Sequence, residues 1–291
     1  MKKILVPVDF SDHANITSSY ALEYAKNFTS EILLYHTYFD QIVIADSSFP
    51  DTIDMNTMYN EELMKEILHQ SEKKLNELEC KLKAKIKNEK IVGVTVRTEV
   101  TGGAIESELR EICNDYQPDL VVIGNKGEGK NISIWGRIST YLVNHINNPV
   151  LLIPEIKGFL GFNNIMVGVD LDEENNALIE RVLGLFDTFP FTLFCVHFLI
   201  PKKHKEEKER FLALKDHFSK KEVNRKISFE MIEIEEDNQK AIDTYIKEHN
   251  IQLIAFQPHK RSIFYTLFTA NITKKNLFAT NIPLLAMPAR D

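Results

Sequence analysis

The chain has 291 residues, enough for two domains of ordinary size, each with its own apolar interior. Hydrophobic residues make up 44% and charged residues 26% of the chain, with 11 Gly and 10 Pro, which excludes collagen-like, low-complexity and wholly disordered classes. A formal charge of -7 offers no general attraction for a phosphate backbone, so we expect no nucleic-acid partner.

Short apolar runs alternate with helical patterns through the first half of the chain. The run Lys3–Asp9 (KILVPVD) predicts a strand buried on both faces of a sheet, and Ser11 and Asp12 offer N-caps for the helix that follows. The further predicted strands are Glu31–Thr37, Ile91–Val100, Leu120–Gly124 and Val150–Ile153, and the predicted helices are Ala14–Asn27, Asn60–Lys87, Ala104–Tyr116 and Ile138–Ile146. This alternation predicts an α/β fold with a mostly parallel sheet.

The pattern then restarts near Asn164. The run Ile165–Asp170 (IMVGVD) repeats the strand that ends at Asp9, and Leu253–Phe256 and Pro283–Pro288 repeat the last third of the first half. We therefore predict two tandem domains with five mostly parallel strands each. Their predicted ranges are residues 1–155 and 163–291, with Pro154–Phe162 as the linker.

The two copies differ in length between their second and fourth strands. Asp170 follows Asp9 by 161 positions but Gln257 follows Gly124 by 133, so the second copy is about 28 residues shorter. The extra material lies within Phe39–Lys90. There an apolar stripe recurs at helical spacing, formed by Leu63, Ile67, Leu75, Leu78, Leu82 and Ile86. We interpret this stripe as packing on the sheet, with partner binding as the alternative.

The segment Gly124–Pro149 places a glycine-bearing loop between a buried strand and the next helix. In open α/β sheets ligands bind beyond the carboxyl ends of the strands, where glycines let backbone N–H groups approach a phosphate. Its glycines and lysines suit an anionic ligand at a helix N-terminus. The loop has no G-K-[ST] sequence and is not GxGxxG, so it is neither a Walker A loop nor a dinucleotide fingerprint.

Together these features resemble the universal stress protein family in its tandem two-domain form. The resemblance rests on the strand VPVDFS around Asp9, the strand LVVIG, the glycine loop and the closing NPVLLIP, each with a counterpart in the second half. It implies Rossmann-like domains of the adenine nucleotide alpha hydrolase-like type that pair through their last strands. Here those strands are Val150–Ile153 and Leu284–Met287, and pairing would cover two exposed sheet edges.

The resemblance also implies an adenine nucleotide site in the first domain, for ATP with Mg²⁺ or a related nucleotide. The family loop has the form G-x2-G-x9-G-[ST]; here Gly136 follows Gly127 after eight residues, and Arg137 stands in place of the hydroxyl. A guanidinium could instead pair with phosphate. The predicted nucleotide-binding residues are Asp9, Thr37 (through its backbone), Gly124, Lys126, Gly127, Lys130, Gly136 and Arg137. For Asp9, capping of the next helix is an equal alternative.

The second half departs further from the family loop. Gln257, Lys260, Ala270 and Asn271 occupy the positions of its glycines and hydroxyl, although Asp170 keeps the strand-end carboxylate. We expect this domain to be a degenerate, largely structural copy.

The sequence predicts a binding protein with little or no catalysis. It has no GxSxG, no HExxH and no His pair at metal spacing, so we predict no catalytic and no metal-ligating residues, and at most very slow ATP hydrolysis. Three scattered cysteines and the lack of a membrane-spanning or signal-type apolar run predict a cytoplasmic protein without a membrane partner. The alternatives are a stress-response protein acting through surface contacts without a nucleotide, and an enzyme using a nucleotide as substrate. A homodimer through other surfaces stays open.

Overall fold

The computed structural model describes residues 1–38, 53–124, 134–171, 175–199, 204–220, 226–233, 238–258 and 281–288. For residues 53–61, 134–136, 204–205 and 238–239 it describes the backbone alone. No helix in these ranges is long and apolar enough to cross a membrane.

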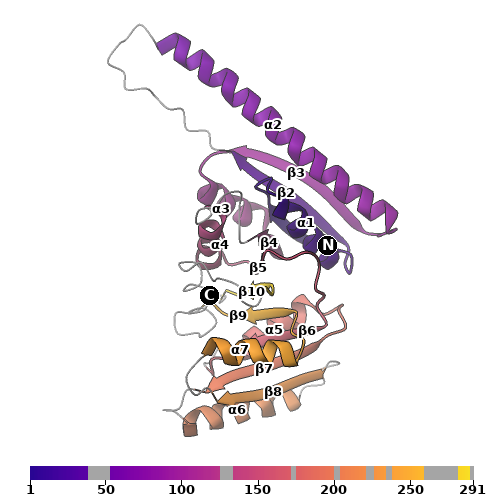
Figure 1. Ribbon diagram of the computed structural model, residues 1–291, viewed down its shortest axis with the longest axis vertical. Helices are drawn as coiled ribbons and strands as arrows, with labels where there is room; N and C mark the ends of the chain where they lie inside the picture. The colour runs from indigo at the N-terminus through magenta and orange to yellow at the C-terminus, as the bar shows by residue number, and fades with distance from the viewer. Residues whose placement is uncertain are drawn as a thin grey trace.

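Strands and helices alternate along both halves of the chain, as the sequence predicts (Figure 1). The first half contains β1 (Lys2–Pro7), α1 (Asp12–Ala25), β2 (Ser30–Tyr38), α2 (Ile53–Asn88), β3 (Val94–Gly102), α3 (Ile105–Tyr116), β4 (Leu120–Gly124), α4 (Ile134–His145) and β5 (Val150–Ile153). The second half contains β6 (Asn164–Gly168), α5 (Asn175–Leu185), β7 (Thr192–Leu199), α6 (His204–Ser219), β8 (Lys226–Glu233), α7 (Asn238–Glu248), β9 (Leu253–Phe256) and β10 (Leu284–Ala286).

The strands form one ten-stranded sheet in the order β3-β2-β1-β4-β5-β10-β9-β6-β7-β8. Neighbouring strands are parallel except β5 and β10, which pair antiparallel with Leu285 opposite Leu151. Read outward from this junction, the two halves have the same strand order. The predicted α/β class and the predicted pairing through the last strands are therefore confirmed. The domain limits at 155 and 163 stay a prediction, although the stretch between Ile153 and Asn164 contains no strand or helix.

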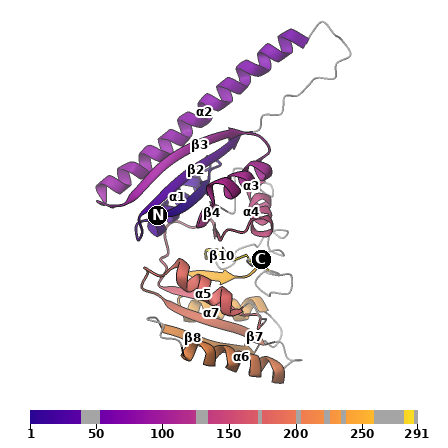
Figure 2. The same ribbon diagram turned by 180° about the vertical axis from the view of Figure 1, so that it is seen from behind.

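Each face of the sheet carries its own apolar core because successive side chains of a strand point to opposite faces. In β1, Ile4 and Val6 belong to one buried cluster and Leu5 belongs to the other. Buried side chains of α1, α2, α5 and α6 line the first cluster, and those of α3, α4 and α7 line the second. Both clusters contain residues of both halves. Figure 2 shows the same elements from behind.

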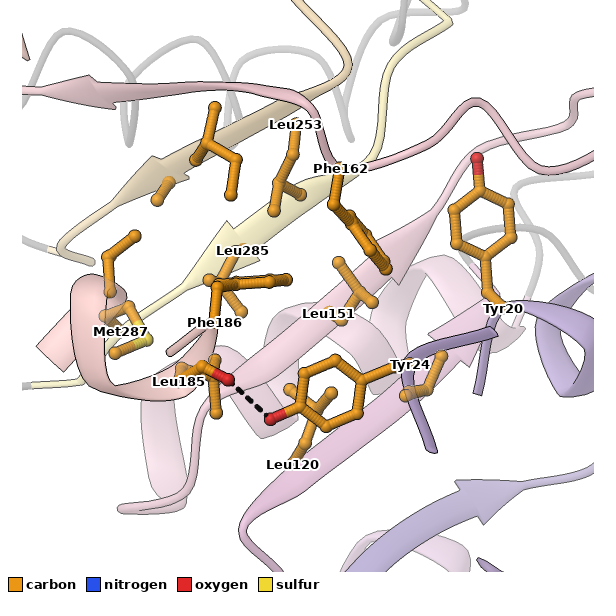
Figure 3. Close-up of a cluster of buried hydrophobic side chains, with 14 of the residues drawn as sticks. Tyr20, Tyr24, Leu120, Leu151, Phe162, Leu185, Phe186, Leu253, Leu285 and Met287 are labelled. Carbon is orange, nitrogen blue, oxygen red and sulfur yellow. Dashed lines mark hydrogen bonds between the residues drawn. The ribbon is translucent and has the colours of Figure 1, made fainter. Parts of the chain in front are cut away.

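The junction between the halves also contains a buried aromatic cluster (Figure 3). The Tyr24 hydroxyl of α1 donates a 2.8 Å hydrogen bond to the Leu185 carbonyl at the end of α5. The Tyr24 ring stacks on Phe189 with centroids 5.6 Å apart and meets Phe186 edge-on. Side chains from both halves therefore form one continuous core across the seam.

The two halves also share unusual backbone conformations at matching positions. Phe10 and Leu171, which follow the strand-end residues Asp9 and Asp170, have φ of 60° and 59°. Gln117 and Asn250, each just beyond a helix, have φ of 49° and 48°. Left-handed backbone is uncommon for residues other than glycine. Its recurrence at these offsets supports the internal repeat inferred from the sequence.

Helix α2 is the largest difference between the halves. It begins at Ile53 rather than at the predicted Asn60 and has 36 residues, whereas its counterpart α6 has 16. Leu75, Leu78 and Leu82 are buried, as the packing interpretation predicts, but Leu63 is 44% exposed. In both ribbon views the N-terminal half of α2 stands away from the sheet (Figures 1 and 2).

Candidate functional site

The candidate site lies at the carboxyl ends of β1, β2 and β4. The chain leaves β1 toward β2 and β3 on one side, and β4 and β5 lie on the other side. The adjacent ends of β1 and β4 are thus the topological switch point, where open α/β sheets bind ligands. Asp9 follows the end of β1, Thr37 is the next-to-last residue of β2, and Gly124 is the last residue of β4. The strand order brings these three predicted residues to one edge.

Asp9 closes the turn between β1 and α1. Its Oδ1 accepts hydrogen bonds from the Ser11 backbone N–H at 3.0 Å and from the Ser11 hydroxyl at 2.7 Å. Between them, Phe10 takes its left-handed conformation. The carboxylate thus fixes Ser11, the residue that precedes α1, while the Ser11 side chain makes no capping hydrogen bond to the helix.

His36 joins the ends of β1 and β2. Its Nδ1 donates a 2.7 Å hydrogen bond to the Val8 carbonyl, and its ring lies 4.2 Å from the ring of Phe10. Burial lowers the pKa of His36, and the positive charge of Lys74 on α2 acts in the same direction. The neutral imidazole leaves Nε2 as a hydrogen-bond acceptor at this edge. Next to it, the hydroxyl oxygen of Thr37 is buried.

Gly124 packs directly against α1. A Cβ added to Gly124 would lie 2.6 Å from His13 Cδ2 and 3.2 Å from Thr17 Oγ1. His13 is buried there because its Nε2 donates a 2.9 Å hydrogen bond to the Ile153 carbonyl at the end of β5. The first glycine of the loop therefore has a packing reason of its own: only a residue without a side chain leaves room for this histidine.

The centre of the predicted loop lies outside the described residues, and with it Lys126, Gly127 and Lys130. The described part resumes with α4, whose first turn contains Gly136. The helix starts at Ile134, earlier than predicted, so the third loop glycine is helical. Arg137 is largely exposed, and its Nε lies 3.4 Å from Glu106 Oε1 on α3. The N-terminus of α4 thus follows the loop, with a cation in its first turn.

A sequence model of the Universal stress protein family matches residues 1–154, more than half of the chain. The chain belongs to the universal stress protein family. The strand-end aspartate, the three loop glycines and the five-stranded half described above all lie within the matched residues.

Known relatives agree with this assignment. A universal stress protein of Methanocaldococcus jannaschii is 27% identical over 157 residues, which are 54% of this chain and 84% of the relative. The crystal structure of a universal stress protein from Archaeoglobus fulgidus is 13% identical and aligns with a TM-score of 0.62, covering 99% of this chain and 97% of that chain. The second comparison extends the likeness of fold to the whole chain, including the half that the family model does not match.

The second half of this family member repeats the strand-end geometry with different side chains. His197 follows His36 by the same 161 positions, and its Nδ1 donates a 2.7 Å hydrogen bond to the Val169 carbonyl. Its Nε2 lies 3.6 Å from Glu207 Oε2 on α6. Gln257, a buried residue, replaces Gly124 at the end of β9, and residues 259–280 lie outside the described ranges.

The role of His13 and the hydrogen-bond partner of His36 were not predicted from the sequence. No sequence pattern marks His13, yet the position of its ring explains why residue 124 is glycine. A signal for His36 was present in the internal repeat, because His36 and His197 are separated by the same offset as Asp9 and Asp170. In the described ranges, no group of three or more His, Cys, Asp or Glu side chains is arranged to hold a metal ion.

Proposed function

We propose that this universal stress protein binds an adenine nucleotide, such as ATP, at the carboxyl edge of its first half as a regulatory ligand. The observation that carries the proposal is the position of the elements that flank the glycine loop: β4 ends with Gly124 at the switch point, next to the end of β1, and α4 begins at Ile134. Backbone N–H groups and the positive end of a helix dipole suit phosphate at such a place.

Different predicted residues would bind different parts of the nucleotide. Asp9 and the backbone at Thr37 would hold the adenosine, while the amides of Gly124 and Gly127, with Lys126 and Lys130, would hold the phosphates. Arg137 would supply a charge-assisted contact in place of the missing hydroxyl. Magnesium would be bound by the phosphates of the nucleotide, since Mg²⁺ in such sites takes substrate oxygens as ligands.

We propose that the protein acts through the binding of the nucleotide and not through its hydrolysis. At the described edge, Asp9 Oδ1 is used by Ser11, and His36 already donates to Val8. The Nε2 atom of His36 can still accept a proton, but burial lowers the pKa of this histidine and makes it a weaker base, so we expect at most very slow hydrolysis. We propose that the protein works in the cytoplasm and that its second half serves as a structural copy.

The test is occupancy and titration. Nucleotide released from the purified protein by denaturation is identified by chromatography, and Mg-ATP is titrated by calorimetry into the parent, Gly127→Val and Gly158→Val. Gly158 lies in the linker with open space around it, so the same substitution there is a matched control. We expect one nucleotide per chain in the parent and the control, and loss of binding in Gly127→Val. Absence of nucleotide and of binding at millimolar Mg-ATP in the parent refutes the proposal.

A protein that acts through surface contacts is the second candidate, and one observation favours it. The additional length of α2 relative to α6 is not needed to cover the sheet, because α6 covers the matching strands with 16 residues. The two functions are compatible in one molecule, since the surface of α2 and the switch point lie on different elements.

A further inference from the structure

A groove lies between the last turns of α2 and the start of β3, at the outer edge of the sheet. It has a volume of about 480 Å³. Val92 at its mouth is 87% exposed. The apolar lining comes from Ile86, Ile91, Val94 and Val96, and the lysines around it are Lys83, Lys87 and Lys90. Among the described residues, neither Lys87 nor Lys90 has an ion-pair partner. The groove is therefore apolar within and positively charged at its rim.

The other half of the same helix has the complementary character. The helical face that buries Ser71 and Leu75 on the sheet continues toward the N-terminus as Met64, Ile67 and Leu68, which are partly exposed. Leu63 flanks this face and is 44% exposed, and the acidic residues Glu62 and Glu66 are exposed beside it. This half of α2 is thus a partly uncovered apolar face bordered by negative charge.

We propose that a second copy of this chain docks here, with the N-terminal half of each α2 lying in the groove of the other. The two α2 helices run antiparallel in this arrangement. Ile67 of one copy then lies near Ile86 of the other, and the pair of contacts is related by a twofold axis. The two positions are 19 residues apart on one helix, so the two contacts are separated by about 28 Å.

Charge selects this orientation over a parallel one. In the antiparallel pair Glu62 and Glu66 of one copy face Lys87 and Lys90 of the other, whereas parallel helices would place acidic halves together. Opposite charges across an interface favour encounter and fix register, and like charges oppose it. Apolar contact between the uncovered face of α2 and the groove supplies the affinity.

The inner edges of the two half-sheets are not open to a second copy. The edges of β5 and β10 already pair with each other within the chain, so they are not available to a partner. Among the described residues of the second half there is no equivalent projecting helix, because α6 has 16 residues. A contact through α2 therefore closes at two copies and does not propagate.

Sedimentation equilibrium of the full chain tests the proposal. We expect a particle of twice the 33.6 kDa chain mass. The double variant Glu62→Lys/Glu66→Lys, and separately Lys87→Glu/Lys90→Glu, should each raise the dimer dissociation constant by at least about tenfold. Combining all four changes exchanges the charges and should restore dimerisation. The matched control Glu206→Lys/Glu209→Lys makes the same charge change at exposed positions of α6 and should leave the dimer intact.

All substituted side chains are exposed, so we expect each variant to fold. Circular dichroism of each variant checks this expectation. A parent that stays monomeric at about 100 µM, above the concentration of a micromolar dimer, overturns the proposal. A dimer that is equally weakened by the control on α6, or that the fourfold variant does not restore, overturns it as well. Nucleotide binding is not involved in any of these readouts, so the outcome is independent of the function proposed above.

Discussion

The two halves of the sheet agree in what the fold needs and differ in what a ligand or a partner would use. Both have the same strand order, a left-handed residue after the first strand, and a histidine on the second strand bonded to a carbonyl of the first. They differ in the residue that ends the fourth strand, Gly124 against Gln257, and in the helix after the second strand.

This difference separates stability from function within one chain. The shared features fix the strand ends in both halves. The features confined to the first half, an uncovered helical segment and a glycine-bearing loop, do not add to the covered sheet. Under the two proposals above, the second half completes the structure at the seam and the first half carries the binding surfaces.

The largest predicted effect comes from breaking what the halves share, their seam. Leu285 of β10 is fully buried opposite Leu151, and Leu152 pairs with Leu284. Leu285→Asp buries an unpaired carboxylate in the centre of the sheet and should lower the free energy of unfolding by about 4 kcal/mol or more. Leu152→Asp should do the same. Urea denaturation followed by circular dichroism measures both.

A matched control for the seam is Leu212→Asp, because Leu212 on α6 is 62% exposed. It should change stability by less than about 0.5 kcal/mol. If the seam variants melt like the parent, the ten-stranded sheet does not form across β5 and β10.

Most of the fold could be predicted from the sequence because its strands are buried on both faces. Continuous apolar runs such as LVVIG mark such strands, and β4, β5 and β9 match their predicted limits. The pairing of the two last strands followed from the family resemblance, and its antiparallel direction comes from the structure. The start of α2 was predicted too late at Asn60, because Met55 and Tyr59 continue the four-residue spacing of Leu63 and Ile67 toward the N-terminus.

The candidate site was less predictable because its decisive contacts are long-range. The contact between His13 and Gly124 joins residues that the sheet order brings together, and a sequence does not state which side chain fills the space beside a glycine. The loop motif therefore indicated a phosphate site, whereas the structure adds a packing cause for the first glycine. Arg137 was predicted as a phosphate contact, and the structure gives it Glu106 as a neighbour.

The second largest effect should come from Gly124→Ala, which makes the first half resemble the second. The backbone at Gly124 suits any residue, but the new methyl group would lie 2.6 Å from the His13 ring. We expect a loss of about 1–3 kcal/mol in the free energy of unfolding. In a His13→Ala background the clash with the ring is gone and the contact with Thr17 Oγ1 at 3.2 Å remains, so the same substitution should cost less than about 1 kcal/mol. An equal cost in both backgrounds, measured by chemical denaturation, contradicts the packing explanation.

A smaller effect should follow from Tyr24→Phe, which removes one polar link between the halves. The Leu185 carbonyl then loses its buried partner, and the expected loss is about 1 kcal/mol. Tyr141→Phe removes a hydroxyl from a partly exposed position on α4 and should change stability by less than about 0.5 kcal/mol. Thermal unfolding of the two variants gives the comparison, and equal effects would show that the bond contributes nothing across the seam.

The smallest effect concerns protonation of His36. Burial lowers the pKa of His36 below its ordinary value near 6.5, so the folded state binds this proton less readily than the unfolded state. The stabilising contribution of the neutral ring is present above pH 6.5 and is lost as the pH falls through the folded-state pKa. His36→Gln keeps a donor for the Val8 carbonyl and removes the titration, so its stability should fall less between pH 7.5 and 5.5 than that of the parent, by up to about 1 kcal/mol. Exposed His145, changed to Gln, is the matched control and should retain the parental slope. If His36→Gln also retains it, neutral His36 does not fasten β1 to β2, and the histidine shared by the two halves is only a packing residue.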